Sequence, residues 1–165
     1  FNNKKYQNKI RSLRNHGTKK NYFHNLVGLN SRLDSIQALI LRLKLIEMKK
    51  ILNIRSKNNN LFIKSIDNDI VNIHSQKNQP MNVFPMTVKN NSKLKKIKSN
   101  LEKNNIQFGT YYPFGLHEFP ISKLIQKKNM FTNTDYVKNN IVTVPCHSKL
   151  NLNDIKKISN IINET

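Results

Sequence analysis

Cysteine is almost absent from this chain of 165 residues, which has only Cys146. A single cysteine cannot form an internal disulfide, and no cysteines and histidines stand at the spacing of a zinc site. Long hydrophobic runs are also missing, because the longest, over residues 36–46, is interrupted by Gln37, Arg42 and Lys44. No signal peptide is visible. The sequence therefore predicts no metal site and no membrane partner, and it favours a reducing, cytoplasmic location.

Acidic residues are scarce: 9 Asp and Glu stand against 29 Lys and Arg, which gives a formal net charge of +20. Such a charge is typical of proteins that bind nucleic acid or an anionic surface. The lysines, however, are scattered over every predicted surface, and asparagine is about as frequent, which indicates coding bias rather than a dedicated basic face. No recognition-helix signature, aromatic ribonucleoprotein box or zinc knuckle is present. We therefore predict no specific nucleic-acid partner and keep a basic nucleic-acid-binding module as the weaker alternative.

The spacing of apolar residues predicts both helices and strands. Helices are expected over residues 4–14, 31–49, 50–66, 92–104, 132–138 and 152–162, and strands over 70–73, 82–88, 106–110 and 141–144. Pro85 favours an edge position or a bulge for its strand. Strands that alternate with helices indicate a small α/β layer. The pattern changes near residue 50, so we predict that residues 1–50 finish one domain and residues 51–165 form a second.

A polar, glycine-containing turn stands directly before the longest apolar segment. Ser31 and Asp34 have the spacing of a capping box, and the apolar residues that follow predict a helix buried nearly all round. The N-terminus of such a helix attracts anions, so free backbone N–H groups, the Asn30 amide and the Arg32 guanidinium are candidates to hold a phosphate or carboxylate. The alternative is an ordinary capped core helix with an exposed arginine.

Motifs in three parts of the chain carry a family resemblance. They are Leu13-Arg14-Asn15-His16-Gly17 with Gly28-x-Asn30-Ser31-Arg32-Leu33-Asp34, then Tyr111-Tyr112-Pro113-x-x-Leu116-His117, and finally Val144-Pro145-Cys146-His147-x-x-Leu150 before an amphipathic helix. In order and spacing they resemble the DegT/StrS family of sugar aminotransferases, which depend on pyridoxal 5'-phosphate (PLP). The resemblance covers almost the whole chain. It implies an α/β fold, the C-terminal part of a fold-type I PLP-dependent transferase. Residues 1–50 would end the large PLP-binding domain and residues 51–165 would form the small domain.

The resemblance also implies which parts of the chemistry this chain holds. The aldimine lysine is expected upstream of Phe1, so the chain is interpreted as a fragment that begins inside a fold, has no catalytic residue of its own and is inactive alone. Asn30 would contact the phosphate of the partner subunit's PLP, which requires a homodimer with shared active sites. Without its missing partners, helix 31–47 predicts poor solubility for the isolated chain.

Four residues are implied to contact the substrate. They are Arg32, Tyr111, Tyr112 and His117. Arg32 would supply a cation to an acidic sugar or a diphosphate, and its alternative role is a surface or interface ion pair, for example with Asp34. Many relatives have histidine where this chain has Tyr111. Gly115 replaces a usual proline, which predicts a looser loop. His16 and His24 match the family pattern but are interpreted as structural.

The implied activity is the transfer of an amino group, with glutamate as the expected donor, to a keto group of a nucleotide-linked sugar. A 3-keto sugar is the first choice, for surface polysaccharide or glycan synthesis. A PLP-dependent sugar dehydratase of the same fold, in which histidine replaces the lysine, is the main alternative. The residue that decides between them lies outside this sequence.

Overall fold

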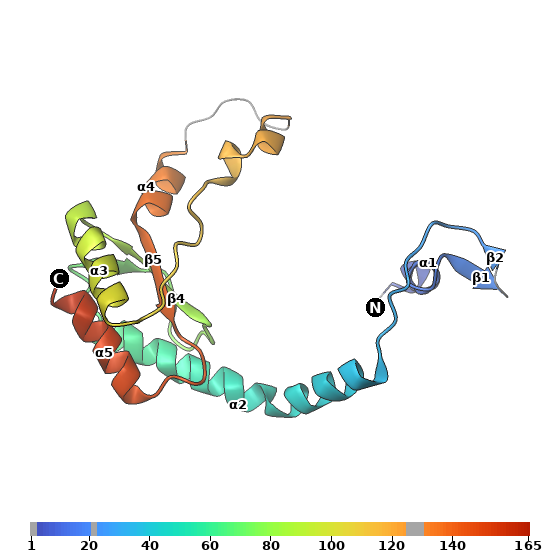
Figure 1. Cartoon of the computed structure of the whole chain (residues 1–165), viewed down its shortest axis with the longest axis horizontal. Coiled ribbons are helices and arrows are strands. Elements are labelled where there is room, and N and C mark those ends of the chain that lie inside the picture. Colours follow the sequence, from blue (N-terminus) through green and yellow to red (C-terminus); the bar gives the residue numbers. More distant parts are fainter. Residues whose placement is uncertain (1–2, 21–22, 125–130) are drawn as a thin grey trace. The chain divides into compact units, whose positions relative to one another are not determined.

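The computed structural model describes residues 3–20, 23–124 and 131–165 (Figure 1). The chain divides into two compact units, Phe1–Glu47 and Met48–Thr165, which we call unit 1 and unit 2. The first elements are α1 (Lys4–Leu13), β1 (Thr18–Lys20), β2 (Phe23–His24) and α2 (Ser35–Ser65). The others are β3 (Val71–Ile73), β4 (Val83–Val88), α3 (Asn91–Lys103), η1 (Leu116–Glu118), η2 (Pro120–Leu124), α4 (Thr132–Asn140), β5 (Ile141–Pro145) and α5 (Leu152–Asn163). Among the described residues, no helix is long and apolar enough to cross a membrane.

In unit 1, the chain turns back along α1 through two residues with positive φ. His16 has φ 56° and Gly17 has φ 73°, and the Gly17 N–H donates to the Ser12 carbonyl at 2.8 Å. Such a left-handed turn satisfies carbonyls that the end of a helix leaves free. The predicted helix over 4–14 is confirmed to within one residue. After it comes the short antiparallel pair β1–β2, in a part of the chain where the apolar spacing predicted neither helix nor strand.

Two glycines allow the backbone to pack directly on itself in unit 1. A Cβ atom on Gly17 would lie 1.7 Å from the Leu26 carbonyl oxygen, and one on Gly28 would lie 2.2 Å from the Gly17 nitrogen. No side chain fits at either contact. The segment that carries Asn30 and Arg32 is therefore held against the end of α1 by backbone contact.

The predicted capping box at Ser31 and Asp34 is wrong. The Ser31 N–H donates to the Arg14 carbonyl at 2.8 Å, so the end of α1 uses this group. Helix α2 begins only at Ser35, and the Asp34 carbonyl accepts from the Ala38 N–H at 2.9 Å, which places Asp34 at the N-cap. The two helices expected over 31–49 and 50–66 are one continuous helix.

The prediction that this helix is buried nearly all round is also wrong for its N-terminal part. Every Leu and Ile side chain of α2 before Glu47 is 47–74% exposed, and these are Ile36, Leu39, Ile40, Leu41, Leu43, Leu45 and Ile46. The other elements of unit 1, α1 and the β1–β2 pair, leave these residues uncovered. We call this set the apolar face of α2.

Unit 2 is built on a three-stranded antiparallel sheet with the strand order β3-β4-β5. Its core joins the sheet to α3, α5 and the C-terminal part of α2 (Figure 1). The largest fully buried side chains include Phe62, Phe84, Met86, Ile97, Leu101, Ile155 and Ile162. The rings of Phe62 and Phe84 stack at a centroid distance of 5.0 Å, which ties α2 to the central strand. The helices and strands predicted for this part are confirmed, with one exception.

The exception is the strand expected over 106–110. In the structure this segment makes a single bridge, between Gly109 and Thr143, with N–H to carbonyl distances of 2.9 Å in both directions. Pro85 was expected at an edge or bulge, and that prediction is wrong because β4 is the central strand. The proline fits there because its nitrogen faces the β3 side, where β3 has already ended and only the His74 N–H donates to the Pro85 carbonyl, at 3.1 Å.

Candidate functional site

The predicted site residues fall into two groups, one in each unit. Asn30 and Arg32 belong to unit 1, while Tyr111, Tyr112 and His117 belong to unit 2. Within each group the structure places the residues on one connected segment. The surroundings of each group are therefore described within its own unit.

Asn30 has a fixed backbone and a free side chain. Its backbone forms an antiparallel bridge with Asn15, and the preceding Leu29 N–H donates to the Leu13 carbonyl at 2.8 Å. The side chain is exposed, and among the described residues it makes no hydrogen bond. Its amide N–H₂ can therefore donate to an anionic oxygen. The sequence predicted that a helix N-terminus at Ser31 would help Asn30 to attract an anion. In the structure that N-terminus lies further along the chain, since α2 begins at Ser35.

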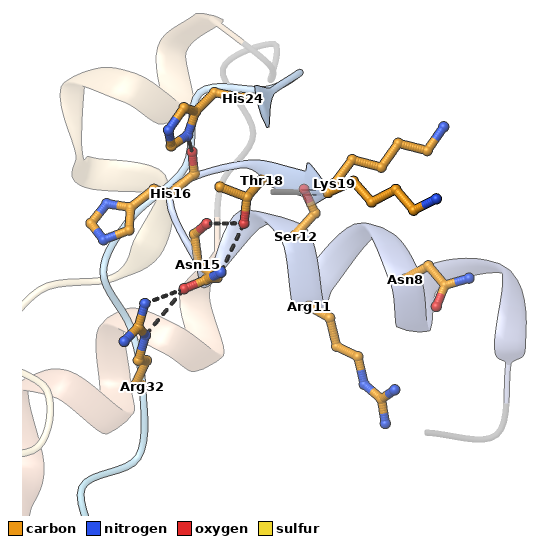
Figure 2. A pocket seen from close by; sticks show the side chains of 10 residues that line it. Asn8, Arg11, Ser12, Asn15, His16, Thr18, Lys19, His24 and Arg32 are labelled. Carbon is orange, nitrogen blue, oxygen red and sulfur yellow. Dashed lines mark hydrogen bonds between the residues drawn. The ribbon is translucent and has the colours of Figure 1, made fainter. Parts of the chain in front are cut away.

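Arg32 is oriented by Asn15. The Arg32 Nε donates to Asn15 Oδ1 at 3.1 Å and its Nη2 donates to the same oxygen at 2.5 Å (Figure 2). Asn15 is fixed in turn, because its Nδ2 donates to Thr18 Oγ1 at 2.8 Å. No ion pair joins Arg32 to Asp34 within the described ranges. The guanidinium thus has no carboxylate partner among the described residues and keeps part of its donor capacity.

Around Arg32 lies a cavity of about 730 Å³, which we call the cationic pocket (Figure 2). Its lining residues are Asn8, Arg11, Ser12, Asn15, His16, Thr18, Lys19, Lys20, His24 and Arg32. The lining contains four permanently cationic side chains and no carboxylate. Cations gathered in a concave surface without counter-charges create a positive potential that suits a ligand with several negative charges.

Sequence reasoning did not single out Arg11, Lys19 or Lys20 for this pocket. These residues were counted among the scattered basic positions. The available signal was the Gly17 turn, because it sends Lys19 and Lys20 back along the helix that carries Arg11. His24 has a structural contact, since its Nδ1 lies 2.8 Å from the His16 carbonyl oxygen and must donate to it.

In unit 2, Tyr111 and Tyr112 follow the Gly109–Thr143 bridge that fixes where the chain leaves the sheet. Their side chains are 54% and 75% exposed, and their rings meet edge to face at a centroid distance of 6.0 Å. Both phenol groups are therefore accessible to a ligand. The tyrosines also line a cavity of about 420 Å³ together with Phe114, Gly115, Leu116, Asn133, Thr134, Val137 and Lys138.

His117 is held more tightly than the tyrosines. Its side chain is 22% exposed, and its ring lies on Phe131 at a centroid distance of 4.8 Å. A Cβ atom on Gly115 would lie 2.5 Å from His117 Cε1, so the glycine makes room for the imidazole. Gly115 is buried, and its N–H donates to Glu118 Oε2 at 2.6 Å. The expectation that this loop is looser than in relatives with proline stays a prediction.

A charged network that sequence reasoning missed surrounds His117. Lys138 Nζ lies 2.6 Å from Glu118 Oε1 and 2.9 Å from Asp135 Oδ1, and His117 Nε2 lies 3.8 Å from the same Asp135 oxygen. The hydrogen bond from Lys138, together with that from the Gly115 N–H, lowers the pKa of Glu118. The bonds to Glu118 and Asp135 raise the pKa of Lys138. Lys138 is therefore an ammonium ion bound to two carboxylates.

The grouping of His117, Glu118 and Asp135 could be a metal site or an ion-pair network. Their potential ligand atoms all lie within 4.8 Å of one another, which is compact enough for a metal ion. The Lys138 ammonium, however, already occupies both carboxylates. A cation there would have to displace it, so the arrangement is that of an ion-pair network.

Comparison with known proteins gives the family. The model of the DegT/DnrJ/EryC1/StrS aminotransferase family matches residues 1–163. A dTDP-3-amino-3,6-dideoxy-alpha-D-galactopyranose transaminase of Aneurinibacillus thermoaerophilus is 23% identical over 155 residues, 94% of this chain and 42% of the relative. A pleiotropic regulatory protein of Geobacillus stearothermophilus is 26% identical over 146 residues, 86% of this chain and 39% of the relative. The chain thus spans about two fifths of the length of these curated relatives.

A solved structure shows the fold. The crystal structure of a DegT DnrJ EryC1 StrS aminotransferase from Brucella abortus matches with a TM-score of 0.84 at 23% identity, over 99% of this chain and 44% of that one. The expected α/β fold, the C-terminal part of a PLP-dependent aminotransferase, is confirmed. This chain belongs to the DegT/DnrJ/EryC1/StrS aminotransferase family.

Proposed function

We propose that this chain is the C-terminal part of a PLP-dependent aminotransferase that transfers an amino group, from glutamate, to a keto group of a nucleotide-linked sugar. The match to the family over residues 1–163 is the observation that carries the proposal. Residues 1–50 would end the large PLP-binding domain and residues 51–165 would form the small domain. A 3-keto sugar and a role in surface glycan synthesis in the cytoplasm are the specific expectations.

Asn30 suits a contact with the cofactor phosphate. Its backbone is held by Asn15 while its amide donors are exposed and unused within the described structure, and amide N–H groups are good partners for phosphate oxygens. PLP, when bound, supplies the electron sink that makes amino-group transfer possible. We infer that Asn30 binds the phosphate held by the partner subunit, as in a homodimer with shared sites.

The cationic pocket suits the diphosphate of a nucleotide-linked sugar. Arg32 is oriented by Asn15, and the other cations of the pocket add charge without any carboxylate to neutralise it. In unit 2 the exposed Tyr111 and Tyr112 can donate to or accept from sugar hydroxyls through their phenol groups, and His117 can do so through its ring nitrogens. The chain's own residues would thus bind and orient the substrate.

The apolar face of α2 supports an assembly larger than this chain. A contiguous set of exposed Leu and Ile side chains of this kind marks a surface that another part of a protein covers. We infer that the rest of the large domain and the partner subunit cover it. This inference agrees with a chain that spans about two fifths of its relatives.

Amino transfer itself tests the proposal. The complete protein, supplied with PLP, ¹⁵N-glutamate and a nucleotide-linked 3-keto sugar, should yield a ¹⁵N-amino sugar detected by mass spectrometry. The same reaction with the 4-keto isomer tests the expected position. Loss of water from the sugar without ¹⁵N incorporation would support the dehydratase instead, and no change to any keto sugar would contradict both.

A further inference from the structure

The segment 110–119 carries the proposed substrate contacts, yet apolar burial does little to hold it. The side chains of Tyr111, Tyr112, Phe114, Leu116 and Phe119 are 44–81% exposed. Exposed apolar side chains contribute little stability. The segment must therefore be fixed by other interactions beyond its bridge to the sheet at Gly109.

Glu118 supplies one of these interactions from within the segment. One carboxylate oxygen, Oε2, accepts from the Gly115 N–H at 2.6 Å, and the other, Oε1, accepts from Lys138 Nζ at 2.6 Å. The first bond closes the turn that brings the His117 ring against Gly115. The second bond joins the turn to another element, α4.

Lys138 is suited to act as a fixed anchor. It lies on α4, its side chain is 16% exposed, and Asp135, one turn earlier on the same helix, holds its Nζ at 2.9 Å. Hydrogen bonds between ions are stronger than neutral ones and keep their geometry better where water is partly excluded. The ammonium also separates two carboxylates that would otherwise repel each other beside His117.

We propose that Lys138 is a positioning residue for substrate binding: through Glu118 and Asp135 it holds the turn 115–118, and with it Tyr111 and His117, in the geometry that contacts the sugar. The sugar contact in this assignment rests on the proposed function, whereas the fixing of the turn by Lys138 depends only on contacts within unit 2. The lysine stem lies in the wall of the cavity that the tyrosines line, so the anchor and the proposed contacts share one surface.

The test combines hydrogen exchange with kinetics in the complete protein. Lys138→Met keeps the stem and removes the charge, Lys138→Arg keeps the charge, and Lys156→Met, at an exposed position on α5, is the matched control. We expect faster exchange of the Gly115 amide in K138M, with wild-type protection in K138R and K156M. We also expect K138M to raise KM for the nucleotide sugar by about tenfold while kcat changes by less than about threefold, which is the pattern of lost uniform binding.

The outcomes separate this assignment from the proposed function. Unchanged Gly115 exchange in K138M overturns the positioning role, whatever the kinetics. Faster exchange with an unchanged KM overturns its connection to the substrate. If kcat falls with KM constant, the Lys138 charge acts on the chemical step or on the amount of active enzyme and not on substrate binding, which also overturns the assignment. A wild-type protein without amino transfer contradicts the proposed function, whereas the exchange data still decide whether Lys138 holds the turn.

Discussion

Asn15 illustrates how single residues set the geometry of unit 1. Its Oδ1 accepts from Arg32, its Nδ2 donates to Thr18, and its backbone pairs with Asn30. One residue therefore relates the proposed phosphate contact, through its backbone, to the proposed substrate cation, through its side chain. The two glycines make this arrangement possible, because Gly28 lies so close to Gly17 that no Cβ atom fits between them.

Gly28→Ala should therefore destabilise unit 1 and displace the segment that carries Asn30 and Arg32. The new Cβ atom would lie 2.2 Å from the Gly17 nitrogen and 2.5 Å from the Leu13 carbonyl oxygen, so backbone must move. We expect the free energy of unfolding of the complete protein to fall by about 2 kcal/mol, measured by urea denaturation. Ser31→Ala, at an exposed side chain nearby, is the control. An unchanged midpoint for G28A would show that this contact is not as close as described.

Cys146 should be an unreactive thiol with a measurable effect on stability at high pH. Burial raises its pKa from 9.0 to about 11. Because the folded state holds the thiol proton more tightly than the unfolded state, this shift contributes to the free energy of unfolding. The contribution is complete below about pH 9 and is lost as the pH rises toward 11. Cys146→Ala should remove this part of the pH dependence, read as the difference between the two unfolding profiles. Rapid alkylation of the native protein at pH 8, or identical profiles, would contradict the prediction.

At the scale of elements, α2 and α4 have different relations to the site. Helix α2 is one continuous helix whose C-terminal part lies in the core of unit 2 through Phe62, while its N-terminal part exposes the apolar face. Helix α4 is short, yet through Lys138 it holds a turn that lies 20 residues away in sequence. Helix α4 thus fixes a turn that it does not itself contain, whereas α2 contributes a core contact and an exposed apolar face.

Replacement of Leu43 by lysine tests whether the apolar face of α2 is covered in the complete protein. Leu43 is 57% exposed in this chain. If the rest of the protein covers it, L43K buries an unpaired charge and should cost about 3 kcal/mol or more of unfolding free energy. Leu152→Lys, at a leucine of α5 that is 50% exposed, should be nearly neutral. Equal, small effects of both variants, measured by urea denaturation, would mean that the face stays open to solvent.

The elements also show what sequence patterns can and cannot predict. Helices α3, α4 and α5 and strands β3, β4 and β5 were predictable because their apolar spacing matches the face that they bury. The capping box failed because Ser31 bonds to Arg14, a tertiary contact that local spacing does not contain. The Lys138 network failed for the same reason: a basic residue on a helix gives no sign of which carboxylate from another segment will meet it.

For the whole molecule, the formal net charge of +20 predicts weak binding to any polyanion at low salt. Because the charge is scattered, binding should show no sequence preference and should disappear near physiological ionic strength. Fluorescence anisotropy with unrelated DNA and RNA duplexes over a salt series measures this. Binding that persists at physiological salt and prefers one sequence would support the nucleic-acid-binding alternative.

Asn30 of one subunit is proposed to bind the cofactor phosphate held by the other, and complementation between subunits tests this arrangement. One variant of the complete protein carries Asn30→Ala, and the other lacks the lysine that holds the cofactor. Each alone should be inactive. Mixed in equal amounts, they should recover about a quarter of wild-type amino transfer, because about half of the dimers are hybrids and one of the two sites in each hybrid is intact. No recovery in verified hybrids, or full activity of N30A alone, would contradict a shared site.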